Sequence, residues 1–84
     1  MPVGWCDGLI EILIARRRNL VFDELRGVLR DAGFHMRRPT GGSHRTFAMS
    51  GCQMIVTVPE RRGPLPLPYV RLAIRAIEEC CEDG

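Results

Sequence analysis

Residues 34–58 contain three short segments in which apolar and polar side chains alternate. Successive side chains of a β-strand point to opposite faces of a sheet, so this alternation predicts three strands. The sequences PTGGS and SGC between them are typical of turns. The side chains predicted to face a core are Phe34, Met36, Phe47, Met49, Met54, Val56 and Val58, and those predicted on the other face are His35, Arg37, His44, Thr46, Ala48, Ile55 and Thr57. Both histidines of the chain are therefore expected on the face turned away from the core.

Three other segments have helical spacing. The first, at about residues 8–17, can be capped by Asp7, and its apolar face consists of Leu9, Ile12 and Leu13. The second ends at Gly33, a residue that favours helix termination, and its apolar positions are Phe22, Leu25, Val28, Leu29 and Ala32. The third opens at Pro68, and its apolar stripe is Val70, Ala73, Ile74, Ile77 and Cys80 or Cys81. The order helix–helix–strand–strand–strand–helix predicts a two-layer α+β domain, with helices on one face of an antiparallel sheet.

The 84 residues are sufficient for one small domain, at residues 1–84. No apolar run approaches the roughly 18 residues that a membrane span needs. The cluster Arg16–Arg18 follows the first apolar segment, whereas a signal peptide carries its charge before that segment, so we expect an unprocessed cytoplasmic chain.

The four cysteines form no C-x-x-C pair, so the sequence predicts neither a zinc site nor a thioredoxin-type motif. Cys80 and Cys81 are adjacent, and adjacent cysteines bridge each other only with strain. For a cytoplasmic chain, the sequence therefore predicts reduced thiols at Cys6, Cys52, Cys80 and Cys81.

Every basic residue other than histidine is an arginine, and all twelve lie in the central segment, residues 16–75. That segment contains only four acidic residues, so its net charge is +8. Two interpretations remain open at this point: a polyanionic partner that meets the central segment, or a basic surface exposed only to solvent.

The sequences FDELRGVLRDAGFHMRR, GGSHRTF and VTVPERRGPLPLPYVRLAIRAIEE occur in this order. Together they resemble the HicA-type toxins of bacterial toxin–antitoxin systems over about residues 20–79. The resemblance implies a fold like that of double-stranded-RNA-binding domains. An additional N-terminal helix, here residues 7–18, also occurs in one branch of such sequences.

The resemblance also implies a function: an mRNA interferase, which is a ribonuclease that needs no metal or other cofactor, silenced by a cognate HicB-type antitoxin. It assigns catalysis to the histidine of GSH, which is His44. Two features depart from the usual pattern. Arg45 and Thr46 follow GSH in place of a histidine or large apolar residue, and Leu65 and Leu67 occupy a connector that often carries lysines. These leucines either anchor a partner or pack on the last helix.

Such a reaction needs few protein groups, because RNA supplies its own nucleophile, the 2′-hydroxyl. A histidine can accept a proton near neutral pH, and arginines can neutralise the charge that develops on the phosphate. Backbone N–H groups beside glycines, here at residues 41–43, can approach a phosphate closely. The residues expected to contact RNA are Arg37, Arg38, Gly42, Ser43, Arg45, Arg61 and Arg62.

Several residues have alternative roles. His35 is either a second proton-transfer group or a solvated strand residue. Ser43 has no recognisable triad around it and is expected to form a turn or a phosphate contact. Trp5 and Tyr69 are expected in the core or an interface. The alternative function is a non-catalytic RNA-binding or protein-interaction module on the same fold.

Overall fold

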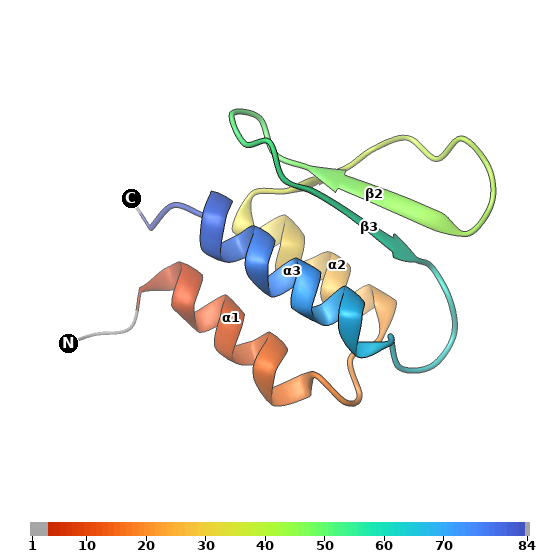
Figure 1. Ribbon diagram of the computed structural model, residues 1–84, viewed down its shortest axis with the longest axis horizontal. Coiled ribbons are helices and arrows are strands. Elements are labelled where there is room, and N and C mark those ends of the chain that lie inside the picture. The colour runs from red at the N-terminus through yellow and green to blue at the C-terminus, as the bar shows by residue number, and fades with distance from the viewer. Residues whose placement is uncertain (1–3, 84) are drawn as a thin grey trace.

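The computed structural model, which describes residues 4–83, has helices on one side of a three-stranded antiparallel sheet (Figure 1). The elements in chain order are α1 (Trp5–Arg16), α2 (Phe22–Ala32), β1 (His35–Met36), β2 (His44–Ala48), β3 (Ile55–Pro59) and α3 (Leu67–Cys80). This α+β order is the one that the sequence predicts. Within residues 4–83, no helix is both long and apolar enough to cross a membrane.

The register of the sheet decides which side chains face the helices. Phe47 of β2 pairs with Met36 on one side and with Val56 on the other, and directly paired residues point to the same face. Phe47 and Val56 are buried, as are Phe34 and Val58, which confirms the predicted core face. Met36 points to the same face, as predicted, because it pairs with Phe47, but it is 39% exposed because β1 is an edge strand of the sheet.

The opposite face of the sheet carries the two histidines. His35 pairs with Ala48 and His44 pairs with Pro59, and both histidines are exposed. Arg37 lies just beyond β1, where its N–H donates to the carbonyl oxygen of Thr46 at 2.8 Å. Because residues 44, 46 and 48 of β2 share one face, His35, Arg37 and His44 lie on the same side of the sheet, as predicted.

In the connector between β3 and α3, Leu65 and Leu67 lie in different environments. The sequence had left open whether these leucines anchor a partner or pack on the last helix. Leu65 is only 3% exposed, and its N–H donates to the carbonyl oxygen of Leu20 at 2.7 Å. Leu67 is exposed and begins α3 one residue before the predicted Pro68. Leu65 therefore belongs to the core of the domain itself. The buried stripe of α3 consists of Val70, Ala73, Ala76, Ile77 and Cys80.

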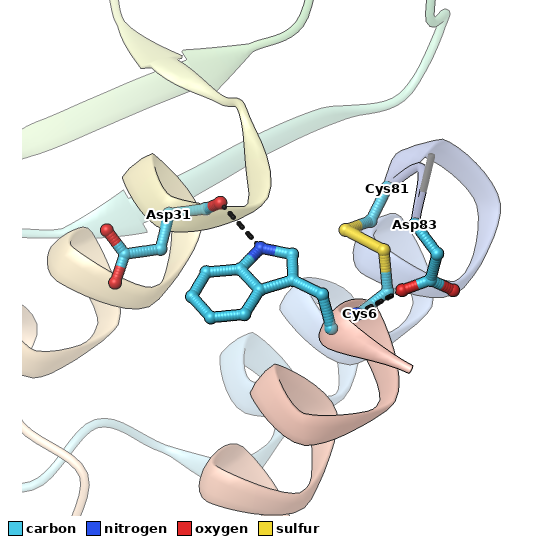
Figure 2. Close-up of a disulfide and its surroundings, with 5 residues drawn as sticks. Cys6, Asp31, Cys81 and Asp83 are labelled. Atoms are coloured by element: carbon cyan, nitrogen blue, oxygen red, sulfur yellow. Dashed lines mark hydrogen bonds between the residues drawn. A yellow bond between two sulfur atoms is a disulfide. The ribbon is translucent and has the colours of Figure 1, made fainter. Parts of the chain in front are cut away.

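Helix α1 begins at Trp5, earlier than predicted, and Asp7 does not cap it. The residue at the N-cap position is Gly4, which has no capping side chain. Instead, Asp83 from the other end of the chain accepts a hydrogen bond from the N–H of Cys6 at 2.7 Å (Figure 2). A carboxylate brought in by the tertiary fold thus satisfies one of the free amides at this helix end.

The apolar face of α1 also differs from the prediction. Leu9 and Leu13 are buried, but Ile12 is 48% exposed because the buried face includes Cys6 instead. Trp5 does not join the core: it is 58% exposed, and its indole N–H donates to the carbonyl oxygen of Asp31 at 3.2 Å (Figure 2).

The four cysteines form two disulfides, Cys6–Cys81 and Cys52–Cys80. The Cα atoms of the two pairs are 5.8 and 5.7 Å apart, within the usual range for a disulfide. The prediction of reduced thiols is therefore wrong. That prediction was based on the spacing of cysteines that are close in the sequence. Folding instead brings together cysteines that are 75 and 28 positions apart.

Candidate functional site

His44 is the first residue of β2 and follows Gly41, Gly42 and Ser43 of the loop that precedes the strand. Gly41 and Gly42 have φ angles of 130° and 67°, a region that side chains with a Cβ rarely adopt. These glycines let the chain turn into β2 just before His44. In Figure 1 this yellow-green loop lies at the end of the sheet opposite to both termini.

A hollow of about 200 Å³ adjoins His44. Its lining residues are Arg37, Arg38, Pro39, Thr40, His44, Arg45 and Thr46. The loop between β1 and β2 folds back on the start of β2 and so brings Arg37 and Arg38 beside His44, whose neighbour in β2 is Arg45. Four of the predicted site residues therefore share one small, exposed depression.

Arg37 and Arg38 supply the available positive charge of this hollow. Both side chains are exposed, and among residues 4–83 neither lies within ion-pair distance of a carboxylate. In the same part of the chain, the N–H groups of Gly41, Gly42 and Ser43 donate no backbone hydrogen bond. The hollow thus offers guanidinium donors, and the loop residues just before His44 offer amide donors; both are suitable groups for binding a phosphate.

Arg45 differs from these two arginines. It points to the helix side of β2, because it pairs with the buried Val58, and its side chain is only 17% exposed. Its Nε atom is 2.8 Å from Oε1 of Glu60, and its Nη1 donates to the carbonyl oxygens of Gly42 at 2.9 Å and His44 at 3.1 Å. The guanidinium of Arg45 is therefore occupied by contacts within the protein.

His35 lies away from the hollow. It pairs with Ala48, four positions along β2 from His44, which corresponds to a distance of about 13 Å at the usual rise of a strand. It adjoins a different depression, which Arg26, Arg30, Phe34, Met36 and Phe47 also line. At that distance His35 cannot share a proton with a group held by His44, which favours its reading as a solvated strand residue.

Arg61 and Arg62 lie in a third depression, between the connector after β3 and the start of α2. Its other lining residues are Val21, Phe22, Asp23, Glu60 and Gly63. The two arginines are exposed but do not line the hollow beside His44. The structure thus places Arg61 and Arg62 in a different depression from Arg37, Arg38 and Arg45.

The sequence analysis assigned no functional role to Glu60 or to the threonines on the face of the sheet that is turned away from the helices. The hydroxyl groups of Thr46 and Thr57 are 3.2 Å apart across β2 and β3. The alternation predicts both threonines on this face, but their pairing depends on the register. Glu60 had no sequence signal beyond its charge, because its role depends on contact with Arg45.

The described part of the chain contains no group of three or more His, Cys, Asp or Glu side chains placed to hold a metal ion. The chemistry available within the hollow is that of one imidazole and of two guanidinium groups that no described carboxylate pairs with, and the adjacent loop residues 41–43 add free backbone amides. These groups can bind an anion and transfer a proton.

Comparisons with family models, with curated proteins and with solved structures find no match to this chain. The resemblance to HicA-type toxins, and the activity that it implies, therefore remain predictions from the sequence.

Proposed function

We propose that this protein is a ribonuclease toxin that cleaves mRNA, with His44 as its only catalytic side chain. The observation that carries the proposal is the hollow in which an exposed histidine lies beside two arginines that have no carboxylate partner among residues 4–83. The resemblance of residues 20–79 to HicA-type toxins supports it independently, because it points to the same histidine.

In the proposed reaction, the neutral imidazole of His44 removes the proton from a 2′-hydroxyl of the RNA. The 2′-oxygen then attacks the adjacent phosphorus, and the bond from phosphorus to the 5′-oxygen of the next nucleotide breaks. The leaving oxygen takes a proton from the imidazolium or from water, so the products are a 2′,3′-cyclic phosphate and a 5′-hydroxyl. Arg37, Arg38 and the amides of residues 41–43 hold the phosphate and stabilise the added negative charge.

The proposal also concerns partner and location. An mRNA substrate implies that the protein acts in the cytoplasm, where thiols are kept reduced, so the proposal also requires that the protein cleaves RNA with its two disulfides open. A HicB-type antitoxin would cover the face that carries His44 and place acidic groups against Arg37 and Arg38, because that contact both blocks the hollow and matches its charge.

The test compares wild type with His44→Ala in the presence of EDTA. Cleavage of a labelled single-stranded RNA should fall by about 10²–10⁴-fold, the usual contribution of a positioned acid–base group. The free energy of unfolding should change by no more than about 0.5 kcal/mol, because His44 is exposed. Rate and thermal unfolding are measured on the same preparations.

His35→Ala is the matched control, since His35 is an exposed histidine on the same face but outside the hollow. It should cleave at nearly the wild-type rate. Equal cleavage by His44→Ala and wild type would refute the catalytic assignment. RNA that binds to wild type without being cut would support the non-catalytic module, and activity that EDTA abolishes would contradict metal-independent cleavage.

A further inference from the structure

Arg45 is held in a closed set of contacts at the start of β2. Glu60, the first residue after β3, donates its backbone N–H to the carbonyl oxygen of Ser43 at 2.6 Å. Its carboxylate is 2.8 Å from Nε of Arg45. The same guanidinium donates to the carbonyl oxygens of Gly42 and His44. Glu60 and Arg45 together thus tie the backbone of residues 42–44 to the end of β3.

Without these contacts, little would restrict the backbone of residues 42–44. Gly41 and Gly42 precede His44, and glycine has more backbone freedom than any other residue. His44 is the terminal residue of its strand and its imidazole is exposed, so packing contributes little to its orientation. The contacts of Arg45 with the carbonyl oxygens on both sides of Ser43 restrict the backbone from which the imidazole projects.

We propose that Arg45 and Glu60 are positioning residues that hold His44 in its reactive orientation, and that Arg45 is not a contact for RNA. The inference rests on the proposed ribonuclease function. It replaces the role expected for Arg45 from the sequence, where any arginine next to the histidine is a candidate phosphate ligand. The small exposure of Arg45 and its ion pair with Glu60 carry the inference.

The two roles predict opposite results for Glu60. If Arg45 bound phosphate, removing the carboxylate would release a cation and reduce repulsion of RNA, so KM would fall and cleavage would not slow. If the pair positions His44, Glu60→Ala should lower kcat by about 10–100-fold, the cost of a small misplacement of a catalytic group, and leave KM within about twofold.

A double-mutant cycle makes the test quantitative. Arg45→Ala should lower kcat as Glu60→Ala does, and the double variant should be no slower than the single variants, because either change breaks the same tie. Glu60→Gln should retain part of the rate, since its amide oxygen still accepts a hydrogen bond from Arg45. Glu11→Ala, which removes an exposed carboxylate from α1, controls for the change in net charge.

Backbone order provides a readout that needs no RNA. In ¹⁵N relaxation measurements, the order parameters of Gly42, Ser43 and His44 should fall in Glu60→Ala, while that of Phe47 should not change. A normal kcat or a lower KM in Glu60→Ala would overturn the inference and leave ribonuclease function intact. Unchanged order parameters would overturn the tie itself. Absence of cleavage by wild type would instead remove the proposed function and this inference with it.

Discussion

Glu24 links the end of α1 to the start of α2 through its carboxylate. Nε and Nη2 of Arg16 donate to its two oxygens at 3.0 and 2.9 Å, and the N–H of Val21 donates to Oε1 at 3.3 Å. The hydrogen bonds from Arg16 are the main reason that the pKa of Glu24 is lowered, and the same contact raises the pKa of Arg16. Both effects favour the ionised pair in the folded state.

We expect Glu24→Gln to lower the unfolding temperature slightly at pH 7, because the two side chains of the lost ion pair are 48% and 38% exposed to solvent. A glutamate with a lowered pKa stabilises the fold above the ordinary glutamate pKa of about 4.3, and this contribution is lost as the pH falls through the lowered value. The difference between wild type and variant should therefore shrink below about pH 4. Melting curves from pH 7 to pH 3 measure this difference in unfolding temperature, with Glu11→Gln as an exposed control. A difference that stays constant over this range would contradict the lowered pKa of Glu24.

At the scale of elements, the junction of α2 and β1 is a Schellman turn. Gly33 has φ 108° and donates its N–H to the carbonyl oxygen of Arg30 at 3.0 Å, while Phe34 donates to that of Leu29 at 2.9 Å. The side chains of Leu29 and Phe34 are both buried. The turn thus ends the helix and directs Phe34 into the core, which sets the face of every later residue of β1.

Gly33→Ala should lower the free energy of unfolding by about 1–2 kcal/mol, because an alanine resists the left-handed conformation. Its added Cβ would also lie 3.1 Å from Cε of Met49. Gly27→Ala is the matched variant within α2: its Cβ would meet no atom within 4 Å, so it should stabilise the protein by about 0.4–1 kcal/mol. Urea unfolding measures the free energy of unfolding of both variants relative to wild type. Changes of the same sign in the two variants would disprove this account.

Across the whole molecule, the disulfides and the candidate site lie at opposite ends. Cys80 is the last residue of α3, and Cys81 follows it. Cys80 is bonded to Cys52 in the turn between β2 and β3, and Cys81 is bonded to Cys6 in the first turn of α1. Figure 1 places that turn and both termini at one end, with the loop before His44 at the other. Cys52–Cys80 therefore joins the sheet to α3, Cys6–Cys81 joins α1 to the end of α3, and no cysteine lines the hollow.

Reduction should lower the free energy of unfolding by about 4 kcal/mol or more, since either disulfide alone closes a long loop. Any RNA cleavage by the folded protein should proceed at the same rate with and without dithiothreitol, because His44 begins β2 and the disulfide of Cys52 lies beyond the other end of that strand. Urea unfolding and cleavage are measured in both states, with all four cysteines changed to serine as the control. Four reactive thiols in folded protein that has not been reduced would contradict the pairing.

The sequence alone determined the order of elements, the two faces of the sheet and the end of α2. These features depend on side-chain period and on the conformational freedom of single residues, which neighbouring positions decide. Phe47 and Val56 on one face and His44 on the other follow from alternation, and Gly33 was identified as a helix end because of its residue type. The position of His44 at the start of a strand was likewise predictable from the glycines before it.

Only the tertiary structure decided the contacts between residues that are far apart in the chain. Asp83 replaces Asp7 at the start of α1, and Arg45, which the sequence suggested as a contact for RNA, is paired with Glu60. Cys80 and Cys81 each find a distant partner, although they are adjacent. No local pattern encodes such pairs, because they depend on where the register of the sheet and the packing of three helices bring separate segments together.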